Sequence, residues 1–441
     1  MHNKINKLTI AIAAASAALV SSQAMAGAFQ LNEQSVSGQG SAFAGRTSNV
    51  SDATIVFGNP AGMSFLDRAQ LSAGATYLDV NTDIKNASGA QPVLNPSTGA
   101  LGLTSTAGSN DGDMVPGTAV PFGYYVHPLN DRMAFGFGVY APFGQITDYE
   151  SGFQGRYFGN RTEIQVITAQ PTLSYRFNDQ FSVGVGVTYN MMEGQLDART
   201  PNPLNPTTAG DGSVKIDGDD EAWGYNIGLI YRPMPSTTLG LTYRSKVEYE
   251  LEGDAKFDNV VGIGSRSAAN PLAMGSLSSS GSLDLTLPET IDFSITHKLD
   301  DRWTVMAGAA FVRWSRFDKL IVENEVMPIE EAQSYENAWQ FAVGAAYQLN
   351  PQWVLRSGLA VDESPIPDDA RTVRVPSSDR TAVSFGAGWT PMPDMTIDLA
   401  YTYLWEDTAP VSQTDEENGY RYQADYENSA HGFGAQLTYR F

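Results

Sequence analysis

The chain has 441 residues, no cysteine and a formal net charge of −22 at pH 7. The lack of cysteine excludes a disulfide framework, a thiolate metal site and a cysteine nucleophile. The acidic balance argues against nucleic acid as a partner, because binding phosphate needs a basic face.

Residues 1–26 are typical of a secretory signal peptide. Lys4 and Lys7 precede an apolar run from Leu8 to Val20, and Ala24-Met25-Ala26 forms a small-x-small cleavage motif. Removing these two lysines takes the mature chain from −22 to −24. The apolar run is shorter than the ~20 residues that a spanning helix needs, and no later stretch reaches that length. We therefore expect any membrane embedding to use β-strands.

Residues 27–66 follow neither the helix period nor the strand period. Small residues dominate the stretch, yet it also carries apolar side chains that a disordered arm seldom has. We interpret it as a compact N-terminal plug with short helical turns, the alternative being an ordinary flexible arm. The apolar residues concerned are Phe29, Leu31, Phe43, Ile55, Val56 and Phe57.

Residues 67–441 are expected to form a barrel wall, because apolar side chains alternate there with polar or small ones. In Phe181–Asn190, Thr396–Trp405 and Phe433–Phe441, one face is apolar with aromatic ends and the other is not. Transmembrane barrels show this dyad pattern, with lipid-facing and lumen-facing positions in turn. A soluble β-sandwich also alternates, but its connections are more uniform in length.

The connections between these segments fall into two classes. Seven are long and polar, near residues 81–118, 143–160, 193–220, 254–282, 319–336, 363–378 and 406–422. Six are short and carry turn residues: 127–132, 177–180, 232–236, 297–302, 350–352 and 391–394. Their alternation predicts an all-β fold, a fourteen-stranded antiparallel transmembrane β-barrel with the N-terminal plug (hatch) in its lumen. We interpret the acidic runs 217–221 and 415–417 as solvated loops. The alternative is a divalent-cation site that bridges to lipid phosphate.

Several stretches resemble the long-chain fatty-acid outer-membrane transporter (FadL) family, which also includes aromatic-hydrocarbon channels. They are FQLNEQSVSGQGSAFAG (29–45) with Asp52-Ala53 and Asn59-Pro60-Ala61, then Trp303–Leu320, Leu355–Pro367 and Val375–Trp389. The terminal Phe441, with Tyr439 and Leu437 before it, resembles the signature of chains delivered to the outer-membrane assembly machinery. The resemblance implies a bacterial outer-membrane barrel in contact with lipid and lipopolysaccharide.

Catalytic chemistry is not expected. The histidines after residue 26 are His127, His297 and His431, and two of them fall in predicted turns, which leaves little for a Ser/His/acid site. No phosphate-binding glycine loop of the GxxxxGK kind occurs. We therefore expect no enzyme activity, cofactor or metal, and transport that is passive.

A passive channel for an amphiphile must solve the problem of release. Each buried methylene contributes ~0.8 kcal/mol, so a long acyl chain gains on the order of 10 kcal/mol in an apolar pocket. A movable plug would weaken that binding, and Asn59, Pro60, Ala61 and Gly62 suit such a gate locally, since Pro60 fixes φ and Gly62 tolerates unusual φ. The alternative is a plain turn into the first strand.

The third strand, Met133–Ala141, is predicted to border a lateral gap in the wall. Gly136 and Gly138 share one face and Pro142 follows, and such residues permit bulges and bends. The resemblance implies that this strand kinks inward and opens the wall beside the plug, which must then satisfy the open strand edge. The alternative is that the glycines make room for the plug.

Candidate ligand-binding residues are the cations near the loops and a methionine pair. Arg156, Arg313, Arg316 and Lys319 are candidates for a carboxylate, although rim cations also bind lipopolysaccharide phosphates or acidic loops. Met191 and Met192 suit an apolar pocket, with one of the pair facing lipid. The sequence thus predicts passive uptake of long-chain fatty acids or similar hydrophobic molecules with lateral release near strand three. The alternatives are an aromatic-hydrocarbon channel, or a non-transport surface protein such as an adhesin or phage receptor.

Overall fold

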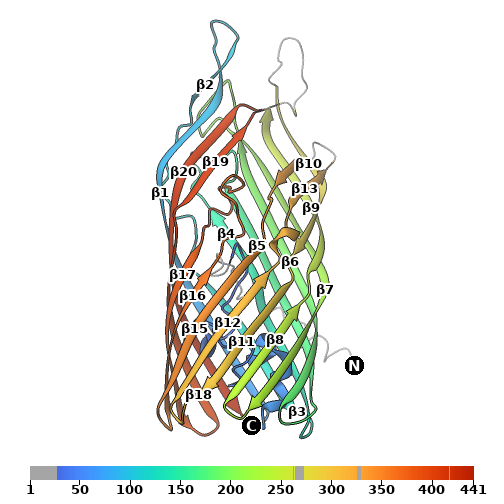
Figure 1. The fold of residues 1–441 in the computed structure, drawn as a ribbon. Helices are drawn as coiled ribbons and strands as arrows, with labels where there is room; N and C mark the ends of the chain where they lie inside the picture. Colours follow the sequence, from blue (N-terminus) through green and yellow to red (C-terminus); the bar gives the residue numbers. More distant parts are fainter. Residues whose placement is uncertain (1–26, 262, 264–272, 325–328, 417) are drawn as a thin grey trace.

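The computed structural model describes residues 27–261, 263, 273–324, 329–416 and 418–441. The predicted signal peptide, residues 1–26, lies outside this range, as do parts of the predicted loops 254–282, 319–336 and 406–422. The described chain forms one elongated barrel (Figure 1). Among the described residues, no helix is long and apolar enough to cross a membrane.

Fourteen antiparallel strands make the wall, which confirms the predicted fold class. Two of them are interrupted, so that β8 with β9 and β10 with β11 each form one strand. The last strand pairs with the first, from Gln70 opposite Arg440 upward, and this pairing closes the barrel. The strands are β1 (Gln70–Leu94), β3 (Thr118–Pro128), β4 (Met133–Asp148), β5 (Arg161–Arg176), β6 (Phe181–Thr200), β7 (Gly212–Met234), β8 (Thr237–Arg244), β9 (Val247–Val261), β10 (Met274–Leu287), β11 (Thr290–Lys298), β12 (Trp303–Val312), β15 (Ala338–Asn350), β16 (Trp353–Asp362), β17 (Arg380–Met392), β18 (Met395–Glu406) and β20 (Tyr420–Arg440).

The six predicted short turns are confirmed, and they all lie at one end of the barrel (Figure 1). The predicted long loops are wrong in extent, because strands continue into them: β6 runs to Thr200 and β7 starts at Gly212. Polar residues lie opposite one another in these extensions, such as Glu193 of β6 and Asp219 of β7. A neighbouring strand satisfies the backbone there, and the polar side chains face water. Short strands β2 (Leu101–Ser105), β13 (Lys319–Asn324), β14 (Ile329–Ala332) and β19 (Ala409–Asp415) complete the loop end.

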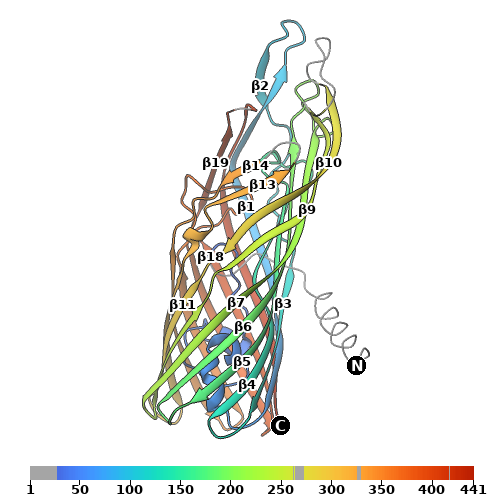
Figure 2. The ribbon, with the colours of Figure 1, turned by 90° about the vertical axis from the view of Figure 1, so that its right-hand side faces the viewer.

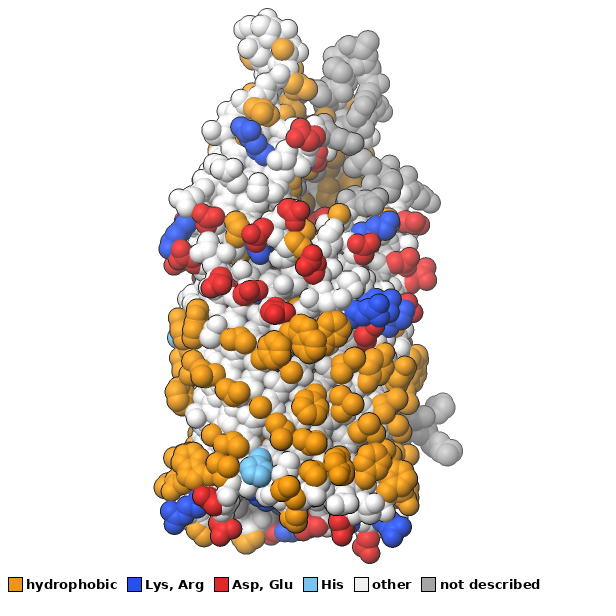
Figure 3. Space-filling model, in the orientation of Figure 1, with side chains coloured by type: hydrophobic (Ala, Val, Ile, Leu, Met, Phe, Trp, Pro, Cys, Tyr) orange, Lys and Arg blue, Asp and Glu red, His pale blue; other side chains and the backbone are white. Residues whose placement is uncertain are grey.

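The outer surface carries a broad apolar band with acidic side chains above it (Figure 3). Six of the seven tryptophans in the sequence are at least partly exposed and fall into two sets. Trp303, Trp353 and Trp389 stand near the short turns, and Trp223, Trp339 and Trp405 stand towards the loops. Aromatic girdles of this kind mark the two interfaces of a membrane. The seventh, Trp314, is fully buried inside.

The N-terminal segment, residues 27–66, lies inside the wall near the short turns (Figure 2). It contains the short helices α2 (Val36–Gln39), α3 (Ile55–Gly58) and the 3-10 helix η1 (Pro60–Phe65), as expected for a compact segment with helical turns. Wall glycines let its backbone touch the strands. A Cβ added to Gly184 would lie 2.3 Å from the carbonyl carbon of Pro60, and one added to Gly240 would lie 1.9 Å from the carbonyl oxygen of Thr47.

Candidate functional site

A row of four glycines crosses the wall towards the loop end. Gly194 of β6 lies opposite Gly218 of β7, Gly218 lies opposite Gly253 of β9, and Gly253 lies opposite Gly281 of β10. Strand register places them on one face, and a cavity of about 520 Å³ lies over them. We call this cavity the glycine groove. Its apolar lining includes Ile164, Met192, Leu251, Leu285, Leu320 and Val322.

An aromatic cluster adjoins the upper end of β12, around the 3-10 helix η2 (Trp314–Arg316). Trp314 packs edge-to-face on Phe29 of the N-terminal segment, with 4.8 Å between ring centroids, and on Phe143 of β4 at 6.1 Å. Phe317 and Tyr335 complete the cluster. The indole Nε1 of Trp314 is buried without a hydrogen-bond partner in the described structure. A buried donor of this kind is costly unless something accepts from it.

The glycine groove and the aromatic cluster belong to one contiguous set of buried apolar side chains. Met192 and Leu285 of the groove, Trp314 of the cluster and Phe143 of β4 are all members. Packed apolar side chains therefore connect the glycine groove, at the loop end of the lumen, to β4.

The upper half of β4 turns away from the wall. Burial alternates along β4 up to Tyr140 and is then continuous to Thr147, so both faces of this part are covered. Pairing with β3 stops at Gly123 opposite Val139, while pairing with β5 shifts register between Tyr140 and Phe143. We call the place where the two strands part the β3–β4 divergence.

The N-terminal segment supplies hydrogen bonds at the β3–β4 divergence. The Leu31 N–H donates to the carbonyl of Pro142 at 2.9 Å, and the Gly144 N–H donates to the carbonyl of Phe29 at 3.0 Å. The Gln34 amide donates to the carbonyl of Ala141. The expectation that the third strand ends at Ala141 is wrong, because β4 continues to Asp148. These bonds replace the partners that β3 no longer provides.

The four residues predicted as a gate are held tightly against the wall. The Asn59 amide donates to the carbonyls of Leu229 and Thr47, both at 2.9 Å, and its oxygen caps η1 through the Ala61 N–H. Wall hydroxyls of β5 and β6 donate to the Ala61 carbonyl at 3.0 and 2.9 Å. Pro60 opens η1, and a Cβ on Gly62 would lie 2.4 Å from the Ile55 side chain.

Gly136 and Gly138 lie on the paired half of β4, below the β3–β4 divergence. A Cβ on Gly136 would lie 2.3 Å from the sulfur of Met63, and one on Gly138 would lie 2.8 Å from the Tyr124 ring. Both positions face the packed interior beside the N-terminal segment. Pro142, by contrast, lies within the inward half of β4.

The predicted cations do not meet at one place. Arg156 is fully buried among the loops, with its Nε 2.6 Å from Asp211 and three further N–H groups bonded to the Tyr157 hydroxyl and two loop carbonyls. A ligand carboxylate would have to displace Asp211. Arg313 and Arg316 both pair with Glu289, at 3.0 and 3.2 Å.

The remaining predicted binding residues divide between the two faces of the wall. Lys319 opens β13 and is exposed. Met192 is buried and lines the glycine groove, whereas Met191 beside it in the strand is only half-buried. The alternation of a strand puts neighbouring side chains on opposite faces, as expected for this pair.

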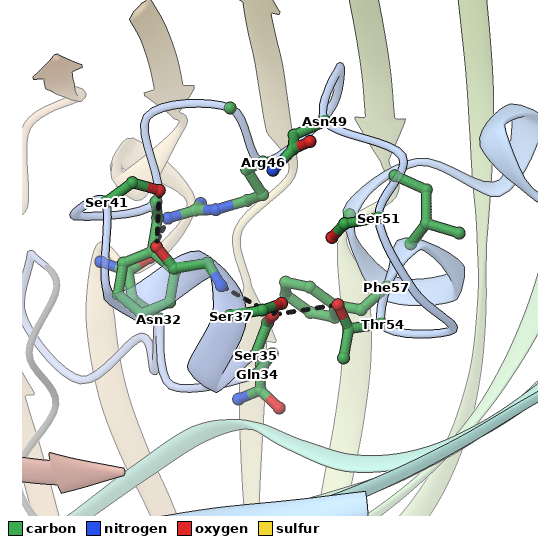
Figure 4. A pocket seen from close by; sticks show the side chains of 15 residues that line it. Asn32, Gln34, Ser35, Ser37, Ser41, Arg46, Asn49, Ser51, Thr54 and Phe57 are labelled. Atoms are coloured by element: carbon green, nitrogen blue, oxygen red, sulfur yellow. Dashed lines mark hydrogen bonds between the residues drawn. The ribbon is translucent and has the colours of Figure 1, made fainter. Parts of the chain in front are cut away.

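A polar cavity of about 440 Å³ lies within the N-terminal segment (Figure 4). Arg46 reaches across it to Asn32 at 2.5 Å, and the Ser35 hydroxyl accepts from Thr54 at 2.9 Å. The segment is therefore hydrogen-bonded internally without being packed solid.

Sequence reasoning missed the buried charges around the N-terminal segment. Arg46 pairs with Asp292 of β11 at 3.1 Å, and Arg380 pairs with Glu406 at 2.6 Å. Burial raises the pKa of Glu33 to about 7, although Arg46 and Arg380 oppose that shift. Glu33 belongs to the stretch FQLNEQ, which carried the family resemblance. That resemblance was the feature of the sequence that could have pointed to Glu33. Trp314 likewise belongs to the resembling stretch Trp303–Leu320. The glycine row had no such signal, because its members come from four different strands.

Comparison with known proteins places the chain in a family. Residues 17–441 match the family described as outer membrane protein transport protein (OMPP1/FadL/TodX). The long-chain fatty acid transport protein of Escherichia coli O6:H1 is 28% identical, over 97% of each chain, and outer membrane protein P1 of Haemophilus influenzae is 28% identical, over 99% of this chain and all of the relative.

Solved structures show the same architecture. A Pseudomonas aeruginosa FadL homologue superposes with a TM-score of 0.81 at 25% identity, covering 94% of this chain and all of the homologue. The Pseudomonas putida toluene transporter TodX shares the fold, with a TM-score of 0.64 at 18% identity over 92% of this chain and 99% of TodX. The barrel, its apolar band and these matches identify an outer-membrane protein, and the chain belongs to the OMPP1/FadL/TodX family.

Proposed function

We propose that this protein takes up long-chain fatty acids or similar hydrophobic molecules by passive diffusion across the outer membrane. The observation that carries the proposal is the continuous set of packed, buried apolar side chains from the glycine groove through Trp314 to the inward half of β4. Two 28% identical relatives with near-complete overlap, from Escherichia coli O6:H1 and Salmonella typhi, bear the name long-chain fatty acid transport protein. The chemistry is binding and release, with no bond made or broken.

The shape of the groove favours an elongated ligand over a single aromatic ring. The four glycines span three inter-strand spacings of ~4.8 Å, or about 14 Å. A backbone floor with leucine and methionine walls offers an apolar slot of this length, in which each methylene gains ~0.8 kcal/mol. The unpartnered Trp314 indole lies beyond it and offers one donor to a polar head group.

Release is proposed to occur sideways at the β3–β4 divergence. Delivery into the periplasm would require each methylene to be rehydrated, whereas passage into the membrane would not. The set of buried apolar side chains includes Phe143 there, and the N-terminal segment covers the unpaired backbone. Movement of residues 29–34 would uncover this unpaired backbone, while residues 59–62 stay hydrogen-bonded to the wall.

Filling the groove tests the entry half of the proposal. A Cβ on Gly194 meets only the flexible end of Leu251, at 3.2 Å, so Gly194→Leu should fold and occupy the slot. We expect uptake of labelled oleate and its binding to the purified protein to fall at least tenfold. The control is Gly102→Leu, at a glycine of β2 with nothing within 4 Å and away from both the groove and the β3–β4 divergence. Normal oleate uptake in Gly194→Leu would favour the aromatic-hydrocarbon or surface-protein alternatives.

Blocking the divergence tests the exit half. Ala141 is buried in the inward half of β4, so Ala141→Trp should obstruct passage there while leaving the groove open. We expect uptake to fall and oleate binding to remain, measured on the same preparation. Full oleate uptake by a correctly inserted Ala141→Trp barrel would contradict lateral release.

The membrane environment is proposed to include further partners. Leu437, Tyr439 and Phe441 are exposed at the C-terminal end, which supports delivery by the assembly machinery. The acidic side chains above the apolar band support lipopolysaccharide as the second proposed partner (Figure 3).

A further inference from the structure

An arginine outside the predicted set of cations lies at the rim of the glycine groove. Arg374 belongs to the loop between β16 and β17. Its Nη1 donates to the Thr162 hydroxyl at 2.9 Å and to the carbonyl of Asp197 at 3.4 Å. These two residues are the chain neighbours of Glu163 and Leu196, which line the groove. The guanidinium therefore lies where β5 and β6 meet the edge of the groove.

The backbone that carries Arg374 is bonded to the inward half of β4. The Thr147 hydroxyl donates to the carbonyl of Arg374 at 3.0 Å, and the Gln145 amide donates to the same carbonyl. Gly159 leaves room for the side chain, since a Cβ there would lie 3.0 Å from Cγ of Arg374. The guanidinium is thus held in place before a ligand arrives, which lowers the entropy lost on binding.

Part of this guanidinium lacks a hydrogen-bond acceptor. In the described part of the chain all its hydrogen bonds come from Nη1, and Nε is buried without an acceptor. Glu331 of β14 is an ion-pair partner, but its Oε2 stands 3.4 Å from Nε. That distance exceeds the ~2.7–2.9 Å of a charge-assisted hydrogen bond. Glu331 lies opposite Leu320, which also lines the groove, so the unused donors are at the same rim.

The carboxylates that line the groove have cations of their own. Glu163 is 2.6 Å from Arg161, and Asp217 is 3.9 Å from Lys215. A ligand that places a carboxylate beside apolar walls needs a cation there, because an unpaired charge is costly to bury. Arginine suits this task, since its planar fork can donate two parallel hydrogen bonds to one carboxylate.

We propose that Arg374 binds the carboxylate of an amphiphile whose hydrocarbon tail occupies the glycine groove. Nη2 and Nε donate to the ligand, while Nη1 keeps its bonds to the wall, and Glu331 competes with the ligand for the same donors. The inference rests on the proposed function and names the residue that distinguishes an acid from a neutral lipid of the same length. The Trp314 indole is an uncharged donor and does not make this distinction.

Two ligands with the same tail test the role of Arg374. Radiolabelled oleate and oleyl alcohol are titrated at neutral pH into the full-length protein, purified from outer membranes in detergent. We expect Arg374→Gln to weaken oleate binding about tenfold or more and to leave oleyl alcohol binding unchanged, and Arg374→Lys to retain part of the preference for the acid. The control is Lys215→Gln, which removes an exposed cation of β7 opposite Asp197 and should bind both ligands like the native protein.

Glu331→Gln gives a second test with the opposite sign. Loss of the competing carboxylate should tighten oleate binding severalfold and leave oleyl alcohol binding unchanged. Equal weakening of both ligands in Arg374→Gln would assign the arginine a purely structural role and overturn the proposal, as would unchanged oleate binding in that variant or weaker oleate binding in Glu331→Gln. A native protein that binds neither ligand would contradict the proposed function itself, and this inference with it.

Discussion

The two halves of the lumen solve different packing problems with the same strands. β10 and β11 together cross the wall once, and their inward side chains change character where the two meet. The loop half presents Leu283, Leu285 and Leu287, and the half near the short turns presents Asp292, Ser294 and Thr296. A buried peptide segment needs hydrogen-bond partners from the wall, whereas an apolar ligand needs none. The lining therefore shows where the barrel holds protein and where it is free to hold something else.

Glycine is used in both halves, for opposite purposes. Near the short turns, Gly184 and Gly240 allow backbone to touch backbone, and an added Cβ would collide with the N-terminal segment. Towards the loops, a Cβ on Gly194 meets only a leucine side chain, and the missing side chains leave a cavity. Substitutions at the two kinds of glycine should consequently fail in different ways.

The largest expected effect is in the loops that close the apolar half. Arg156→Ala leaves Asp211 buried without its cation, which should cost about 3–5 kcal/mol locally. We expect faster proteolysis within residues 201–211 and an unchanged heat-modifiable barrel, because the wall strands do not depend on this pair. If Arg156 binds ligand instead, its loss would abolish the preference for oleate over oleyl alcohol while the loops stay protease-resistant.

Gly184→Ala should break the half that holds protein. Its Cβ would lie 2.3 Å from backbone atoms of Pro60, which cannot move without breaking the Asn59 and Ala61 hydrogen bonds. Overpacking of this kind costs about 1–3 kcal/mol. We expect small hydrophilic solutes to leak through reconstituted barrels, with Gly123→Ala as the silent control. A tight barrel in both variants would show that residues 27–66 do not seal the lumen.

The smallest expected effect is a pH dependence at the boundary between the halves. Burial raises the pKa of Glu33 from 4.5 to about 7, so the folded contact favours the protonated acid. That stabilisation is complete below pH 4.5 and is lost as the pH rises through 7. Between pH 6 and 8 the attachment of the N-terminal segment should weaken by about 1 kcal/mol. Protease access to residues 27–34 should rise with pH in the native protein and stay flat in Glu33→Gln.

The sequence alone determined the wall. Alternation of side chains with period two depends only on strand geometry, and the two classes of connection length are those of an outer-membrane barrel, with short periplasmic turns and longer outer loops. The fourteen strands and the six short turns were therefore predictable. The compact N-terminal segment was also visible, because apolar residues without periodicity need a buried environment.

Only the tertiary structure decided which residues meet inside. The glycine groove exists because the register of four strands brings Gly194, Gly218, Gly253 and Gly281 into one row, and register depends on the closure of the whole barrel. Likewise, the position of Arg156 in a polar loop suggested that it could bind a ligand carboxylate. Its guanidinium is instead bonded to Asp211, which lies 55 residues further along the chain. The sequence determines which interactions each side chain is able to make. Its burial and its interaction partners are supplied by residues far away in the chain, and these determine which of those interactions form.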